Sequence, residues 1–142
     1  MRYIAHRGNI TGPNPARENQ LKYIDFAIDL GYDVEIDIRS VDNQLYSGHD
    51  DPQYKIDEEW IQERSHALWI HCKNKDALIF FNGTTYNYFW HQNDHYTLTS
   101  KNFIWTYPNI SPTPNSIIVT HNKQKQPLDV AGICSDYIGA WQ

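Results

Sequence analysis

The sequence predicts an α/β fold, a compact and reduced TIM-barrel-like barrel from which several outer helices are missing. About eight segments have the composition of β-strands, but only three have convincing helical signals. Polar residues suited to catalysis follow the ends of the early strands, where barrel enzymes carry out their chemistry. The 142 residues fit one domain, 1–142, whereas a complete (β/α)₈ barrel typically needs about 250.

Strands and helices are expected to alternate in the first half of the chain. Gly31 ends the first helix, and Glu58 and Glu59 suit the positive end of the second helix dipole. The expected elements are a strand over 2–5, a helix from Glu18 or Asn19 to Leu30, a strand over 33–38, a loop over 44–48, a helix capped by Asp57 and running to Arg64, a strand over 68–73, and a helix capped by Asn74 and ending at Asn82-Gly83.

The second half of the chain is expected to contain strands without helices. Aromatic and β-branched residues dominate its apolar segments. The connection at 100–102 is short enough for a hairpin, which predicts at least one antiparallel pair. The expected strands cover 86–91, 96–99, 103–107, 116–120 and 131–135.

Two carboxylates on one strand are the first candidate for a metal site. Residues 33–38 alternate acid and aliphatic, so Glu35 and Asp37 share one face of the strand. Carboxylates on one face suit a hard divalent cation that also binds a substrate phosphate. The alternative is an edge strand with a solvated acidic face.

Two histidines lie near these carboxylates in the sequence. His6 ends the first strand, and Gly8 permits a turn that leaves His6 and Arg7 at the C-terminal end of that strand. His49 is followed by Asp50 and Asp51, either of which can orient its ring. Two histidines of this kind beside a carboxylate pair favour acid–base catalysis over purely structural roles.

The order of these motifs resembles the glycerophosphodiester phosphodiesterase domain family, of the phosphatidylinositol-phospholipase-C-like phosphodiesterase superfamily. The resemblance is dense over residues 3 to 52 and sparse beyond them. The matching segments are I-A-H-R-G (4–8), R-E-N (17–19), D-V-E-I-D-I (33–38), G-H-D (48–50), Lys73, W-T (105–106) and G-I-C-S-D-Y (132–137).

The resemblance assigns roles to these residues. It implies that His6 and His49 act as general acid and base, that Arg7 binds phosphate and that Glu35 and Asp37 hold a metal ion. The metal would be one divalent cation, Mg, Ca or Mn, with Zn possible. Such a protein would act on a glycerophosphodiester-like or related small-molecule, lipid or glycan phosphodiester.

The chain departs from the family at the third acidic metal ligand. His71 stands where the family has Glu in an E-x-K motif, so imidazole is the expected third ligand. A nitrogen ligand shifts the metal preference towards manganese or zinc. The alternative is that His71 only forms a hydrogen bond while water fills the coordination position.

Three further residues are candidates for supporting roles. Lys73 is expected to project beside His71 and neutralise a phosphate oxygen, although an ordinary exposed lysine explains it equally well. His91 is expected to contact substrate, with turn chemistry as the alternative. Glu18 matches a site-supporting family position, and its alternative is an acid at the start of a helix.

Composition narrows the classes of partner. The 12 Lys and Arg against 17 Asp and Glu give a net charge of -5, which argues against a nucleic-acid partner. Without a signal peptide or membrane span, a cytoplasmic protein is expected. Cys72 and Cys134 are expected to be buried thiols, with Cys72 facing the outer layer.

Three functions are consistent with the sequence. The first is a metal-dependent phosphodiester hydrolase, with water or a neighbouring hydroxyl as the attacking group. The second is a phosphate-binding module on the same barrel that has lost turnover, and the third is a structural protein that binds no metal. The sequence leaves the oligomeric state open.

Overall fold

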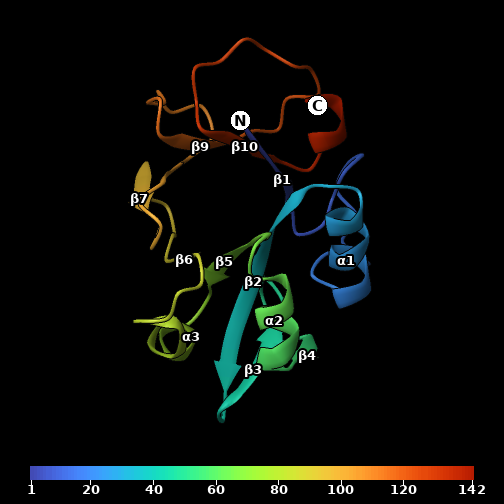
Figure 1. The fold of residues 1–142 in the computed structure, drawn as a ribbon, viewed down its shortest axis with the longest axis vertical. Coiled ribbons are helices and arrows are strands. Elements are labelled where there is room, and N and C mark those ends of the chain that lie inside the picture. Colours follow the sequence, from blue (N-terminus) through green and yellow to red (C-terminus); the bar gives the residue numbers. More distant parts are fainter.

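One curled sheet of ten strands organises the chain in the computed structural model, which describes residues 1–142 (Figure 1). Three short α-helices, α1 (Leu21–Asp29), α2 (Glu58–Arg64) and α3 (Lys75–Phe81), and a 3-10 helix, η1 (Ile138–Ala140), accompany it. The strands are β1 (Arg2–His6), β2 (Asp33–Val41), β3 (Gln44–Ser47), β4 (Tyr54–Ile56), β5 (Leu68–Cys72), β6 (Tyr88–Phe89), β7 (Tyr96–Leu98), β8 (Ile104–Thr106), β9 (Ser116–Val119) and β10 (Gly132–Ser135).

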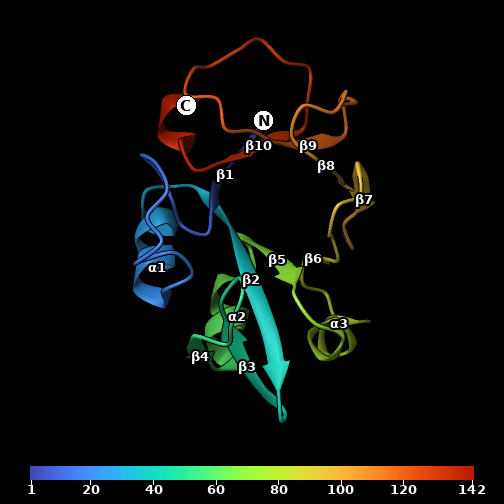
Figure 2. The ribbon, with the colours of Figure 1, turned by 180° about the vertical axis from the view of Figure 1, so that it is seen from behind.

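The sheet is mixed and remains open. Strands β8, β9, β10, β1, β2, β5 and β6 are neighbours in that order and run parallel, whereas β3, β4 and β7 pair antiparallel. The sheet curls until β6 and β7 approach one another (Figure 2). No strand pairing joins β6 to β7, although the Ser100 N–H donates to Tyr88 O at 2.8 Å.

The expectation of a TIM-barrel-like barrel is therefore wrong. Helices and strands do not alternate around this sheet, because no α-helix follows β6, β7, β8 or β9. The connection from β7 to β8 spans only 99–103, whereas parallel strands need a crossover of about a dozen residues or more. Strand β7 consequently returns antiparallel to β8, as the hairpin expected from the sequence.

Several local expectations are also decided by the structure. The expected loop over 44–48 is wrong, because Gln44–Ser47 forms β3 and pairs with the end of β2. Asp42 and Asn43, with φ of 50° and 62°, make the two-residue turn between these strands. Asn74 caps α3 as expected, with its side chain accepting from the Ala77 N–H. The first helix, α1, begins at Leu21, later than predicted.

Each face of the sheet carries an apolar cluster, and the two clusters differ in size. Val34, Ile36 and Ile38 of β2 belong to the larger core, where the sheet packs against α1, α2 and α3. The other face of the curled sheet contains a smaller cluster, Ile4, Trp69, Phe89, Trp105, Ile117 and Cys134. Both cysteines are free and buried. Cys72 belongs to the larger core on the helix side of the sheet, as expected.

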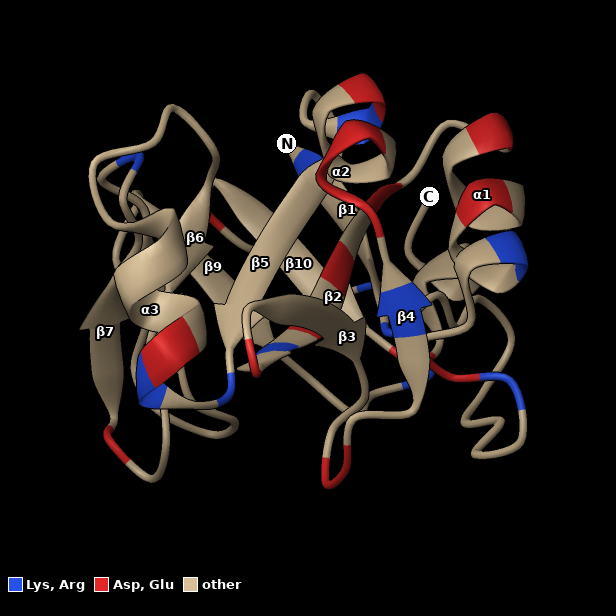
Figure 3. Cartoon of the chain, turned by 90° about the horizontal axis from the view of Figure 1, so that it is seen from below, with Lys and Arg blue, Asp and Glu red and all other residues tan.

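Charged residues are distributed unevenly over the elements. Figure 3 shows acidic residues on all three α-helices and along β2, and single Lys or Arg residues on the same helices and on β4. None of the helices is both long and apolar enough to span a bilayer.

Candidate functional site

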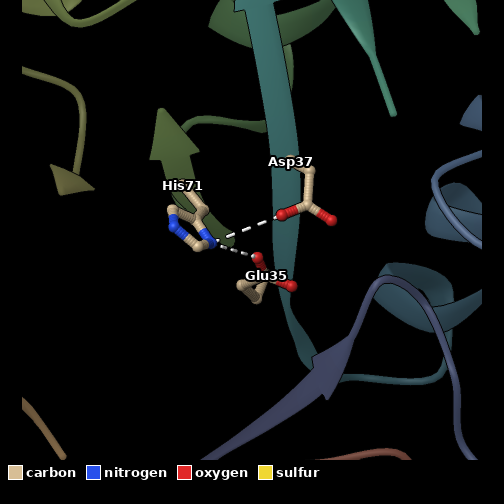
Figure 4. A group of neighbouring side chains, drawn as sticks. All are labelled: Glu35, Asp37 and His71. Atoms are coloured by element: carbon tan, nitrogen blue, oxygen red, sulfur yellow. Dashed lines mark ion pairs between the residues drawn. The ribbon is translucent and has the colours of Figure 1, made fainter. Parts of the chain in front are cut away.

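Glu35, Asp37 and His71 form an acidic and imidazole cluster on the face of the sheet opposite the helices (Figure 4). The parallel register places Asp37 of β2 beside His71 of β5. His71 Nδ1 lies 3.4 Å from Glu35 Oε1 and 3.3 Å from Asp37 Oδ1. Glu35 is 1% exposed and Asp37 is fully buried. The period-two alternation of the sequence therefore brings both carboxylates to one imidazole.

The cluster fits a divalent cation. One ligand atom from each residue lies within 4.8 Å of the others. Donor atoms about 2.1 Å from a shared ion are separated by roughly 3.0 to 3.4 Å at octahedral or tetrahedral angles, close to the separations from His71 Nδ1. Glu35 Oε2 and Asp37 Oδ1 are buried and accept no hydrogen bond. Such carboxylate oxygens are costly to bury without a partner, and the nearest positive groups are the imidazoles of His71 and His6.

Asn19 and Arg7 fix the orientation of Asp37. The Asn19 side chain donates to Asp37 Oδ2 at 2.9 Å and accepts from the Asp37 N–H at 3.0 Å. Arg7 Nε lies 3.1 Å from the same Oδ2. Burial favours protonation, but His71, Arg7 and Asn19 outweigh it and hold the pKa of Asp37 well below its usual range. Asp37 therefore stays ionised with Oδ1 directed towards His71.

His71 is held charged when no metal is bound. Burial lowers its pKa, but the carboxylates of Asp37 and Glu35 outweigh burial and raise the pKa to about 9. The His71 ring also stacks on Phe89, with ring centroids 4.8 Å apart. The proton on His71 thus supplies a positive charge between the two carboxylates.

His6 is oriented by residues from the far end of the chain. Its Nδ1 lies 2.8 Å from Asp136 Oδ1, which also accepts from Asn9 Nδ2 at 2.8 Å, and its Nε2 lies 3.7 Å from Glu35 Oε2. Burial lowers the pKa of His6, but the Asp136 hydrogen bond and the Glu35 charge outweigh it and leave the pKa raised. His6 therefore directs Nε2 towards the carboxylate cluster.

His49 lies on a tight loop directly after β3. The Gly48 N–H donates to Asp37 O at 3.0 Å, and a Cβ at Gly48 would lie 1.9 Å from Asp51 O. His49 Nδ1 is 2.7 Å from Asp50 Oδ1, so Asp50 is the acid that orients the ring. The guanidinium of Arg39 donates to the backbone carbonyls of both Gly48 and His49.

A cleft of about 260 Å³ brings most of the candidate residues together. Glu18 lies beside it, where it accepts from Arg7 NH1 at 3.2 Å and supports that guanidinium. Lys73 does not line the cleft, and its backbone N–H donates to Ile38 O at 2.9 Å. The lining residues are His6, Arg7, Glu35, His49, His71, His91, Trp105, Tyr107, Pro108, Val119 and His121.

Sequence reasoning assigned no role to several residues in and around the cleft. Asp136 and Asn9 contact His6, Asn19 holds Asp37, and Tyr107 and His121 line the cleft. Asp136 directly follows the last strand, just as His6 follows residues 2–5. This shared position was the signal in the sequence that could have identified Asp136 as a site residue. The spacing of His121 from the other candidate residues in the sequence does not indicate a role, because His121 reaches the cleft only through the pairing of β9 with β10.

A second hollow, of about 330 Å³, lies at the opposite ends of the parallel strands. Arg2 lines it and lies over Trp69 and Phe103 at 5.8 and 5.5 Å from the ring centroids. The Arg2 guanidinium is already paired with Asp33 at 3.2 Å. No carboxylate lines this hollow, so it contains no acidic cluster like that around Glu35.

Comparison with family models, curated proteins and solved structures returned no match to this chain.

Proposed function

We propose that the chain is a metal-dependent phosphodiester hydrolase, similar in chemistry to the glycerophosphodiester phosphodiesterases. The observation that carries the proposal is the shared cleft, in which two histidines, a guanidinium and a cation-compatible cluster meet from β1, β2, β5 and the loop after β3. Its substrate would be a small-molecule or lipid phosphodiester.

The charges of the cleft support an anionic ligand. Arg7 lines the cleft, and its buried Nε lies 3.1 Å from Asp37 Oδ2. Glu18 anchors Arg7 NH1, so the guanidinium is held in place. A planar guanidinium is well suited to bind phosphate oxygens. A bound divalent cation, held by Glu35, Asp37 and His71, would neutralise negative charge that develops on those oxygens.

The two histidines supply the proton transfers in this proposal. In the neutral form of His6, Asp136 fixes the proton on Nδ1 and leaves Nε2 as the base. Asp50 orients His49 in the same way. One histidine accepts a proton from the attacking water or substrate hydroxyl, and the other protonates the leaving alkoxide. The two assignments remain interchangeable, since both rings line the cleft.

The test is turnover of bis(p-nitrophenyl) phosphate and of glycerophosphodiesters with saturating Mn²⁺ or Mg²⁺. We expect His6→Ala and His49→Ala each to reduce turnover by about 10² to 10⁴, the contribution of a positioned acid or base. Lys73→Ala is the matched control, and it should leave turnover within about twofold because Lys73 lies outside the cleft. Phosphorus NMR distinguishes a cyclic phosphate product from direct hydrolysis.

The competing function is a phosphate-binding module without turnover. It predicts phosphodiester binding with no product from the wild type, and no dependence of binding on His6 or His49. Full activity in either histidine variant would remove that residue from the mechanism.

A further inference from the structure

We propose that His71 makes this site selective for transition-metal ions, Zn²⁺ or Mn²⁺, over Mg²⁺ and Ca²⁺. This inference rests on the proposed function only in using the same metal site. It concerns which ion the site holds, and metal binding alone tests it.

The tautomer of His71 is fixed by the backbone. His71 Nε2 lies 2.8 Å from the carbonyl oxygen of His91. A carbonyl only accepts hydrogen bonds, so Nε2 carries a proton in both the charged and the neutral imidazole. In the neutral ring the lone pair is on Nδ1, the nitrogen that faces Glu35 Oε1 and Asp37 Oδ1. A carbonyl that holds the distal N–H of an imidazole is the usual second contact of a metal-ligating histidine.

The ring cannot easily turn away from this position. His71 stacks on Phe89 with an interplanar angle of 17°, and its side chain is only 14% exposed. A flipped ring would separate Nε2 from the His91 carbonyl and leave a buried donor without a partner. Nδ1 is therefore preorganised as a third donor beside two oxygen donors.

This donor set differs from that of a magnesium or calcium site. Mg²⁺ and Ca²⁺ bind through oxygen ligands, whereas imidazole suits zinc and other transition metals. Two carboxylates and one neutral imidazole also balance the charge of a divalent ion, where a third carboxylate would leave an excess negative charge. An anionic phosphodiester is therefore repelled less by this cluster than by three carboxylates.

The experiment measures the affinities of Mn²⁺, Zn²⁺, Mg²⁺ and Ca²⁺ by calorimetry, without substrate, for the wild type and three variants. His71→Glu replaces the nitrogen donor with a carboxylate. His71→Gln keeps an N–H donor near the position of Nε2 and removes Nδ1. His66→Glu adds the same charge at an exposed histidine before β5, at the far end of that strand, and is the matched control.

We expect the wild type to bind Mn²⁺ at least about tenfold more tightly than Mg²⁺. His71→Glu should lower this ratio by about tenfold or more, His71→Gln should weaken Mn²⁺ and Zn²⁺ most, and His66→Glu should leave the ratio unchanged. An unchanged ratio in His71→Glu and His71→Gln overturns the proposal.

Nitrogen NMR of the wild type tests the same point without a substitution. Binding of diamagnetic Zn²⁺ should shift the His71 Nδ1 resonance and preserve the Nε2 proton. A bound Zn²⁺ that leaves Nδ1 unshifted overturns the proposal even if the variants fail to fold. Metal selectivity without phosphodiester turnover would overturn the proposed function and leave this inference standing, and turnover with no dependence of selectivity on His71 would do the reverse.

Discussion

The imidazole of His6 and the carboxylate of Asp136 are joined by a 2.8 Å hydrogen bond, although 130 residues separate them in the chain. The parallel register of β1 and β10 pairs Ala5 with Ser135, so the residues that follow these two strands emerge side by side. The first and last strands thus jointly fix the orientation of the His6 ring.

Replacing Asp136 is expected to impair His6 without removing it. Asp136→Asn keeps an oxygen that accepts from Nδ1 but removes the negative charge, so the pKa of His6 should fall from its raised value. Turnover should lose part of the factor of about 10² to 10⁴ that a positioned base contributes. The pKa is measured by proton NMR of the ring and compared with the pH profile of kcat/KM.

Asp29→Asn is the control for this change, because Asp29 is an exposed residue of α1 that does not line the cleft. An Asp136→Asn variant with an unchanged pH profile would show that the carboxylate charge does not act on His6.

Asn19 is expected to control metal affinity through Asp37. Asn19→Asp retains an acceptor for the Asp37 N–H and tolerates the φ of 65°, but it replaces the donor to Asp37 Oδ2 with a repelling oxygen. Loss of such an orienting contact typically costs about 10- to 100-fold in metal affinity. Calorimetric titration with Mn²⁺ measures it. Equal affinity in Asn19→Asp and wild type would contradict the positioning role.

The metal-free protein is expected to lose stability as the pH rises. The pKa of His71 is raised to about 9 in the folded state, against an ordinary value near 6.5. A group whose folded pKa is raised contributes its full stabilisation below the unfolded pKa and loses it as the pH passes through the folded value. The free energy of unfolding in EDTA should therefore fall between about pH 6.5 and 9, by on the order of 3 kcal/mol.

Urea unfolding at each pH measures this loss, with His71→Gln as the reference that lacks the titrating group. The slope of stability against pH over this window should be smaller in His71→Gln. Parallel curves for the two proteins would show that His71 does not titrate there.

Residues close in sequence were the easiest to predict. Period-two alternation was sufficient to place Glu35 and Asp37 on one face, because strand geometry fixes that relation locally. The cap at Asn74 followed from local chemistry in the same way. The direction of the Lys73 side chain depends on how the chain leaves β5, which the sequence does not fix, and Lys73 is not among the residues that line the cleft.

Relations between distant segments could not be predicted in this way. The contact of Asp136 with His6 requires the register of β1 with β10, which no local pattern encodes. The open sheet follows from the missing crossover helices after β6, and the number of strands alone did not reveal it. Strand β4 at Tyr54–Ile56 is only three residues long, too short for a periodic signal.

The last prediction concerns Gly48, which shapes the loop that presents His49. Gly48 has φ of 150°, and an added Cβ would collide with Asp51 O at 1.9 Å, so Gly48→Ala must displace the loop backbone. Gly31→Ala is the matched control, because Gly31 also has a positive φ, 94°, but nothing lies within 4 Å of its Cβ position. Each variant should lose about 1 to 3 kcal/mol of stability through backbone strain. Only Gly48→Ala should also lower turnover, approaching the loss in His49→Ala, because only it moves the His49 ring. Turnover by Gly48→Ala equal to that of Gly31→Ala would mean that the position of His49 is not set by this turn.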